Sequence, residues 1–240
     1  MRNELLLILS IVVLYGAVLG AYKWFGKAGM YAFTVFATIT ANIEVMLLVD
    51  AFGMEMTLGN ILFATTFLVT DILSETEGKD AAQKAVWLGI GTSALFVFVS
   101  QSWLLYHVNA NDYLFPAFQQ IFSNTPRLIL ASLLVYAIAQ SFDVWMYHFW
   151  WRFTRRKFGD GRRFLWLRNN VSTLLSQLIN VVLFTTFAFW GTYSMKTMFS
   201  IFVASYAVFI VTSLCDTPIL YLARRIHEKR QQSTASKAMD

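Results

Sequence analysis

Cysteine is almost missing from this chain of 240 residues, which carries a single one at position 215. A lone cysteine can form neither an internal disulfide nor a cluster of metal-binding thiolates. The three histidines lack the H-E-x-x-H spacing of a zinc site, and no phosphate-binding loop, dinucleotide fingerprint or nucleophile elbow occurs. These absences argue against zinc-dependent, nucleotide-binding and serine-hydrolase proteins, so we expect no metal, no cofactor and no catalytic residue.

Charged side chains are also scarce, at 14% of the residues, whereas roughly 25% is usual in a soluble domain. Apolar residues make up 57%, which is more than a soluble protein of this size could bury. Several apolar runs reach the length of about 20 residues that a helix needs to cross a bilayer. The composition therefore indicates an integral membrane protein, with the lipid bilayer as its partner.

We predict an all-α fold, a polytopic membrane bundle of seven transmembrane helices. A single membrane domain covers residues 1–225, and a flexible cytoplasmic tail covers 226–240. We count the first apolar stretch as a span because it is too long for a signal peptide. The expected spans are 4–24, 29–50, 57–77, 82–106, 128–150, 170–191 and 195–223.

Positive charge sets the expected orientation of these spans. The net charge of +5 is concentrated in a few loops rather than along a nucleic-acid-binding face. Seven Lys and Arg residues lie within 151–168 and four within 224–230. Because cytoplasmic loops carry the excess of Lys and Arg, we expect the N-terminus outside and the C-terminus on the cytoplasmic side of the membrane.

Four carboxylates lie away from the ends of these spans, where a charge is costly and indicates a functional site. They are Glu44, Asp71, Asp143 and Asp216, in the second, third, fifth and seventh spans. Asp71 shares one helix face with Glu75, which lies at the inner boundary of the third span. Because Lys and Arg are almost missing from mid-span positions, these acids require protonation, a water-filled cavity or a ligand that supplies donors.

Candidate carboxamides lie in the second, fifth and sixth spans, of which the second and fifth also carry one of the four acids. Hydrogen bonds between helices, worth about 0.6–2 kcal/mol each, would explain any one of them without a ligand. Alternatively, the acids and amides together would suit a planar, donor-rich base of the guanine type, because a carboxylate accepts two parallel hydrogen bonds from such an edge. The candidate amides are Asn42, Gln140, Asn170, Gln177 and Asn180.

Three segments, NILFATTFLVTDILSETEGKDAAQKAVW, FLWLRNNVSTLLSQLINVVLFTTFAFWG and SLCDTPILYLARRI, occur in this order along the chain. In this combination the chain resembles the queuosine precursor transporter family, also called the vitamin uptake transporter family. The resemblance covers roughly residues 30–225. It implies an inner-membrane importer of 7-deazaguanine bases (7-cyano-7-deazaguanine, 7-aminomethyl-7-deazaguanine or queuine) for salvage of the queuosine tRNA modification. It also implies a six-helix core at 29–223, to which the first span at 4–24 is additional. The positions that match the polar pattern of the family are Asn42, Asp71, Glu75, Gln140, Asp143, Asn170, Gln177, Asn180 and Asp216.

Other classes stay open at this point. The chain could be the substrate-binding membrane subunit of an ATP-driven vitamin uptake system. It could be an embedded enzyme that binds a metal at Asp71 and Glu75, or a structural membrane protein with polar helix packing. A homo-oligomer is also open, because the spacing of Gly16 and Gly20 permits close helix contact. Under the transporter hypothesis, we expect the four acids to converge with the amides of the sixth span on one pocket near mid-membrane.

Overall fold

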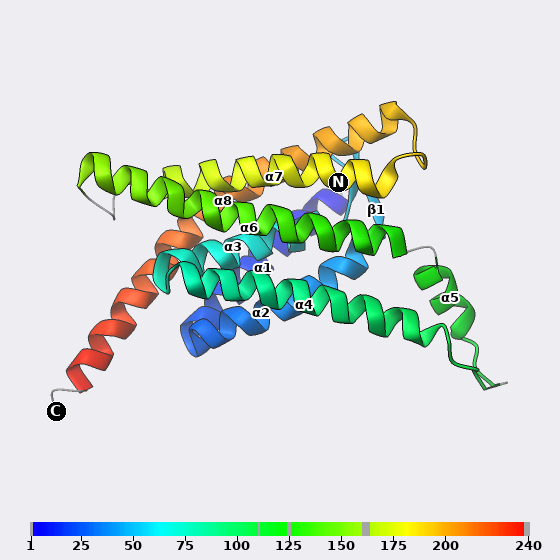
Figure 1. Ribbon diagram of the computed structural model, residues 1–240, viewed down its shortest axis with the longest axis horizontal. Coiled ribbons are helices and arrows are strands. Elements are labelled where there is room, and N and C mark those ends of the chain that lie inside the picture. Colours follow the sequence, from blue (N-terminus) through cyan, green and yellow to red (C-terminus); the bar gives the residue numbers. More distant parts are fainter. Residues whose placement is uncertain (1, 110, 124–125, 160–163, 238–240) are drawn as a thin grey trace.

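The computed structural model describes residues 2–109, 111–123, 126–159 and 164–237, most of which are helical (Figure 1). One short β-hairpin interrupts the series of helices. In chain order the elements are α1 (Arg2–Phe25), α2 (Lys27–Glu44), β1 (Leu48–Ala51), β2 (Met54–Thr57), α3 (Asn60–Thr76), α4 (Lys79–Trp103), α5 (Phe115–Ser123), α6 (Pro126–Phe158), α7 (Leu165–Phe189) and α8 (Met195–Lys237).

Five of these helices, α1, α4, α6, α7 and α8, are long and apolar enough to cross a membrane. The predicted helical membrane bundle is therefore confirmed, whereas the count of seven spans is not. The two remaining helices of the predicted set, α2 and α3, have only 18 and 17 residues. At 1.5 Å per residue they extend about 26 Å, slightly less than the roughly 30 Å hydrocarbon core of a bilayer.

The β-hairpin replaces the end of the predicted second span, so the expected range of 29–50 was too long. Helix α2 ends at Glu44, and the two strands pair so that Leu48 lies opposite Thr57. Phe52 and Gly53 form the connection, with φ angles of 54° and 73°. Positive φ at both central residues is what a two-residue hairpin turn of the common type requires, because its twist then matches that of the strands.

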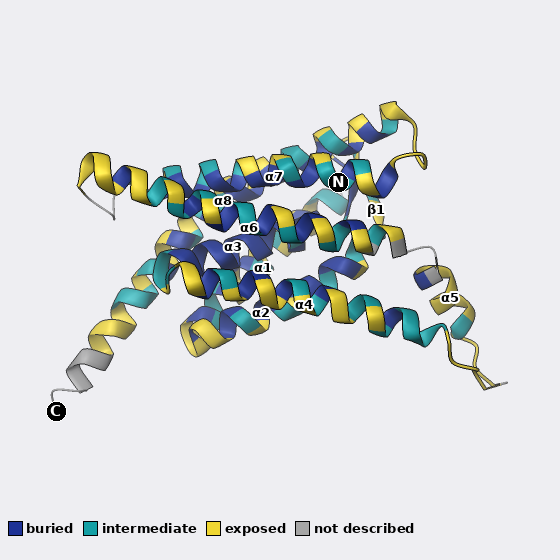
Figure 2. Cartoon of the chain, in the orientation of Figure 1, coloured by how far each residue is buried: buried dark blue, intermediate teal, exposed yellow. Residues whose placement is uncertain are grey.

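Helix α3 lies at the centre of the bundle, in contact with α1, α2, α4, α6 and α8. Every residue from Asn60 to Ser74 except Phe63 is buried, and Figure 2 shows this helix largely in dark blue. A helix buried on all sides has no lipid-facing stripe, so its polar side chains must find partners on neighbouring helices. The position of α3 therefore decides which helices can meet its Asp71.

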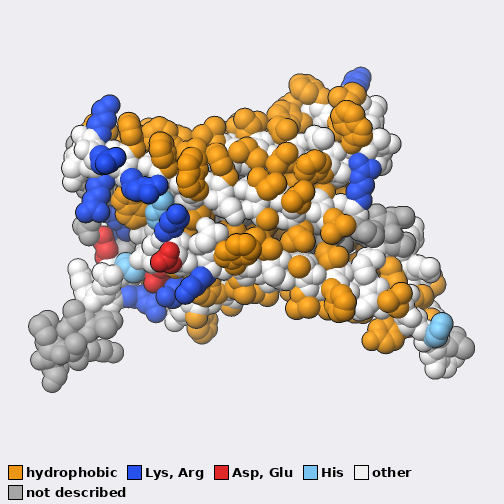
Figure 3. Space-filling view, in the orientation of Figure 1, with side chains coloured by type: hydrophobic (Ala, Val, Ile, Leu, Met, Phe, Trp, Pro, Cys, Tyr) orange, Lys and Arg blue, Asp and Glu red, His pale blue; other side chains and the backbone are white. Residues whose placement is uncertain are grey.

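Positive charge gathers at one end of the bundle, which we call the basic end (left in Figures 1 and 3). The end of α6, the starts of α4 and α7 and the last turns of α8 all lie there (Figure 1). The β-hairpin and α5 lie towards the other end, and apolar side chains cover the surface between the ends (Figure 3). The described parts of the segments that we predict to be cytoplasmic thus lie at the same end of the molecule.

Helix α8 runs from Met195 to Lys237 with Pro218 inside it. Residues 226–237, for which the sequence suggested a flexible tail, continue this helix. Between α4 and α6 lies the nine-residue helix α5.

Candidate substrate-binding site

Three buried aspartates meet in the interior of the bundle: Asp71 from α3, Asp143 from α6 and Asp216 from α8. Their side chains are exposed by 1% or less. The carboxyl groups of Asp71 and Asp143 interact directly, and Asp216 lies close enough to both to affect their charge. We call these three residues the aspartate cluster. Part of the predicted convergence is therefore present, since acids from three separate spans share one location.

Hydroxyl groups of α7 serve as donors to the aspartate cluster. Thr173 Oγ1 donates to Asp71 Oδ2 at 3.1 Å, and Ser176 Oγ donates to Asp143 Oδ1 at 2.8 Å. Residues three and four apart share a helix face, so this pair and Gln177 lie on the side of α7 that faces the acids. The spacing explains how one helix can contact two carboxyl groups from different helices.

Apart from the contact between Asp71 and Asp143 themselves, four oxygen atoms of the aspartate cluster meet no hydrogen-bond donor within the described ranges. They are Asp71 Oδ1, Asp143 Oδ2 and both carboxyl oxygens of Asp216. Tyr15 of α1 lies beside Asp216, but its hydroxyl donates to the carbonyl oxygen of Thr212 at 3.3 Å. Buried acceptors of this kind are costly unless a proton, a cation or a ligand completes them. The aspartate cluster can therefore accept hydrogen bonds from the donor groups of a bound ligand.

Two of the predicted amides are held by other protein groups. Gln140 Nε2 donates to Thr66 Oγ1 at 2.6 Å, and Gln140 Oε1 accepts from Thr70 Oγ1 at 3.1 Å. Asn42 Nδ2 donates to Ser93 Oγ at 3.1 Å. These bonds join α6 to α3 and α2 to α4, which is the helix-packing role that was weighed against ligand binding.

Asn170, Gln177 and Asn180 extend the polar face of α7 to both sides of the aspartate cluster. Asn170 Nδ2 donates to Thr217 Oγ1 at 2.8 Å, next to Asp216 in the chain. Asn180 Nδ2 donates to Gln177 Oε1 at 3.1 Å, and Gln177 Nε2 lacks an acceptor in the part of the chain that the structure describes. Gln177 thus offers a donor where the neighbouring carboxylates offer acceptors.

Glu75 belongs to an ion-pair network that the sequence reasoning missed. Its Oε2 accepts from Arg168 Nη2 at 2.5 Å and from the Tyr147 hydroxyl at 2.8 Å, and Arg224 Nη1 lies 3.5 Å from Oε1. Arg168 was assigned to a cytoplasmic loop because α7 was expected to begin at residue 170, whereas it begins at Leu165. The acidic face of α3, which lacked a cation in the sequence, could have suggested that a nearby arginine turns inward.

Glu44 is half-buried at the last residue of α2, where that helix ends before the hairpin. No contact with the aspartate cluster is found for it among the residues that the structure describes. The structure therefore brings together Asp71, Asp143 and Asp216 but not all four predicted acids.

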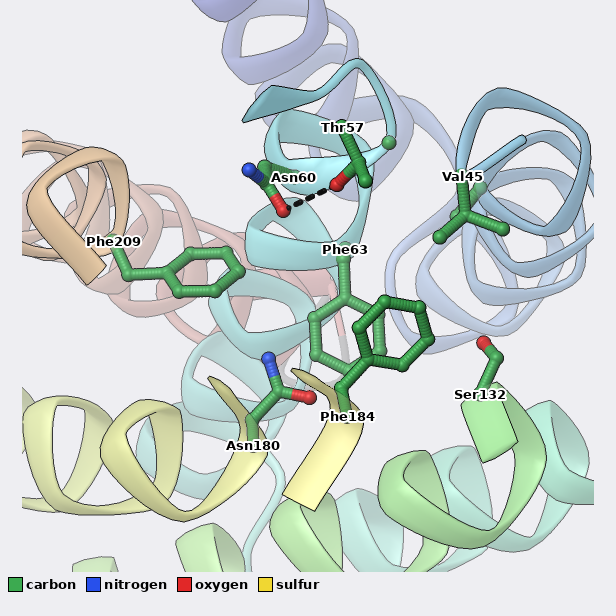
Figure 4. A pocket seen from close by; sticks show the side chains of 10 residues that line it. Val45, Thr57, Asn60, Phe63, Ser132, Asn180, Phe184 and Phe209 are labelled. Carbon is green, nitrogen blue, oxygen red and sulfur yellow. Dashed lines mark hydrogen bonds between the residues drawn. The ribbon is translucent and has the colours of Figure 1, made fainter. Parts of the chain in front are cut away.

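A small cavity lies towards the hairpin end of the bundle, on the same face of α7. Figure 4 shows Asn180 and Phe184 of α7 opposite Asn60 and Phe63 of α3, with Phe209 of α8 beside them. Its volume is about 30 Å³. Pockets for drug-sized ligands measure roughly 300–1,000 Å³, so this cavity cannot hold a bicyclic base. Asn180 lies two helical turns, or about 10 Å, from the Thr173 that contacts Asp71.

Comparison with known proteins identifies the family. A family model described as "Putative vitamin uptake transporter" matches residues 57–223. The chain belongs to this family. A protein of Bacillus subtilis (strain 168) named "Probable queuosine precursor transporter" is 36% identical over 234 residues, which cover 98% of this chain and 100% of the relative. No solved structure matches the chain.

Membership of the vitamin uptake transporters confirms the resemblance and makes the chain a membrane transporter rather than an enzyme. The matched segment begins at the end of the hairpin and contains the whole aspartate cluster. It leaves out α1, α2 and the two predicted site residues on α2. The Bacillus subtilis relative, in contrast, matches almost the full length, so the first helix is not peculiar to this chain.

Proposed function

We propose that this chain imports a queuosine precursor, a 7-deazaguanine base, across the cell inner membrane by secondary transport. The single observation that carries the proposal is the aspartate cluster, in which carboxyl oxygens from α3, α6 and α8 lack donors among the described residues. The name of the Bacillus subtilis relative supports the choice of substrate. The base would be taken up for salvage of the tRNA modification.

The chemistry of the cluster fits such a base. The edge of a guanine-type ring presents an N–H and an amino group side by side, and one carboxylate can accept from both. Gln177 Nε2, which lacks an acceptor within the described residues, would donate to the adjacent ring carbonyl. Asp71 and Asp143 contact one another, so one of the two would carry a proton whenever no ligand donor is present.

The rest of the predicted site takes a smaller part in this proposal. Glu75 is already neutralised by two arginines, and Gln140 is held by two threonines. We assign both to helix packing, together with Asn42, and leave Glu44 outside the site. Asn170 and Asn180 would line the path on either side of the aspartate cluster.

In the proposed topology the basic end faces the cytoplasm, with the N-terminus outside and the C-terminus inside. The clustering of Lys and Arg at that end supports this orientation (Figure 3). Seven spans result if α2 and α3 are counted as short ones, and the central position of α3 supports the count. Because the cavity beside Asn180 is far smaller than a base, the described conformation would have to open before substrate can bind.

The test is uptake of a labelled 7-deazaguanine base into bacterial cells that cannot make it. We expect Asp71→Asn, Asp143→Asn and Asp216→Asn each to lower uptake at least tenfold, since each removes an acceptor without changing side-chain size. Asp50→Asn, on the exposed side of strand β1, is the matched control and should transport normally. Normal uptake by all three cluster variants, at equal protein level in the membrane, would refute the site.

A second measurement separates secondary transport from an ATP-driven system. Proteoliposomes that contain only the purified chain should accumulate or equilibrate the base without ATP. Uptake that requires ATP and an added energising subunit would show that the chain is the binding subunit instead.

A further inference from the structure

The basic end carries a pocket that is separate from the aspartate cluster. It has a volume of about 300 Å³ and lies between the junction of α3 with α4 and the outer side of α6. Lys79, Arg152 and Arg155 line it, together with Gly78 and Trp151. All three cationic side chains are exposed, so they can reach a ligand at the membrane surface.

Charge in the pocket is positive overall. One carboxylate, that of Glu75, also lines it, but this group is neutralised by its ion pairs with Arg168 and Arg224. The three cations of the pocket are therefore not needed to balance Glu75. Three positive charges around one concave space favour an anion with several oxygen atoms, because guanidinium groups bind carboxylate and phosphate oxygens in pairs.

Two polar atoms that line the pocket have no hydrogen-bond partner among the described residues. Ser74 Oγ and His148 Nε2 make no hydrogen bond within the ranges that the structure describes, and Ser74 is fully buried. Both can act as donors to an anionic oxygen, Ser74 through its hydroxyl and His148 through the tautomer with a proton on Nε2. These groups point to a ligand independently of the exposed cations.

The start of α4 adds to the same preference. Gly78 precedes the first residue of this 25-residue helix and provides no side chain to cap it. The unpaired backbone N–H groups of a helix N-terminus favour negative charge. The N-terminus of α4 and the cations of α6 thus border one pocket.

Apolar side chains continue from the mouth of the pocket along α6. Phe149 and Phe153 are exposed by 42% and 45% and lie beside Arg152 on the outer surface of the bundle. A free anion would leave this surface unused, whereas a phospholipid would bring acyl chains to it. We propose that the pocket binds a phosphate group and that an anionic phospholipid supplies it.

The test is the thermal stability of the purified full chain in bilayer nanodiscs. Discs of phosphatidylcholine alone are compared with discs that contain phosphatidylglycerol, and with phosphatidylcholine discs in inorganic phosphate. We expect phosphatidylglycerol to raise the melting temperature by about 5 °C or more, since a ligand that binds only the folded state stabilises it. The double variant Arg152→Gln/Arg155→Gln should lose this shift.

The matched control is Lys84→Gln/Arg225→Gln, which removes the same charge from exposed positions that do not line the pocket. It should keep the phosphatidylglycerol shift. A further outcome is that inorganic phosphate raises the melting temperature as well, with the rise lost only in Arg152→Gln/Arg155→Gln. That outcome would support phosphate binding in the pocket and identify a soluble phosphate group, rather than a lipid, as the ligand. No shift with either ligand, or an equal loss in both double variants, would overturn the proposal.

Discussion

The ion pair between Arg168 and Glu75 yields the most quantitative prediction. Both side chains are almost fully buried, at 0% and 4% exposure, and the guanidinium also stacks over the Trp151 ring at 4.5 Å. Replacing Arg168 by Met keeps the volume but leaves Glu75 with Tyr147 and Arg224 alone. Removing one partner of a buried pair costs about 3–5 kcal/mol. Arg224 lies 3.5 Å from Glu75 and offsets part of that cost, so we expect about 3 kcal/mol.

Thermal unfolding of the purified protein in detergent, followed by circular dichroism, measures the effect. At about 2–4 °C per kcal/mol for a chain of this size, Arg168→Met should lower the melting temperature by about 6–12 °C. The double variant Glu75→Gln/Arg168→Met should recover most of this loss, because no uncompensated charge stays buried. Arg225→Met, at an exposed position, is the control and should change stability by less than about 0.5 kcal/mol.

Equal instability of the single and the double variant would refute this prediction. That result would mean that the packing of Arg168 against Trp151, rather than the charge pair, stabilises the basic end. A melting temperature of Arg168→Met equal to that of the native chain would refute it as well.

Three further predictions concern packing and backbone geometry, each measured by the same unfolding assay. A Cβ atom at Gly89 would overlap the Tyr136 ring, so Gly89→Ala should cost about 1–3 kcal/mol, whereas Gly91→Ala, with open space around it, should not destabilise. Phe52→Asn should stabilise the chain by about 0.5–1 kcal/mol, because asparagine tolerates the positive φ of that turn better. Gln140→Met should cost about 1 kcal/mol but leave uptake of the base intact, and a large loss of uptake would place Gln140 in the site.

The sequence predicts the membrane class and most of the span positions because both depend on local composition. Runs of apolar residues predict both ends of α1 and α4, and the first residues of α6 and α8, to within a few residues. Helices α6 and α8 continue beyond the apolar runs at their C-terminal ends. The same approach extended the second span to residue 50, because the hairpin residues are as apolar as a helix end. Only the dipeptide Phe52-Gly53 marks the turn, and aromatic-glycine pairs are not a strong turn pattern.

The polar interior was harder to predict, because helix faces can be read from spacing but neighbours in space cannot. Spacing placed Asp71 and Asp143 on interior faces, and the structure joins them. Spacing could not show that Glu75 already has Arg168 as a partner, since the two are 93 residues apart. Nor could it show that Gln140 is held by α3, because a buried amide looks the same in the sequence whether it binds a helix or a ligand.

Pro218 has no amide hydrogen to give to the carbonyl oxygen of Leu214, one turn earlier in α8. Helix α8 can bend there at low cost in free energy, since no backbone hydrogen bond has to break. After Pro218 in the chain, Arg224 forms an ion pair with Glu75, and His227 Nδ1 lies 3.6 Å from Glu77 Oε1 at the end of α3. A small rotation of the part of α8 that follows Pro218 would break both contacts together while Asp216 stays in place. In the orientation proposed above, this movement would open the cytoplasmic end of the bundle and leave the aspartate cluster intact.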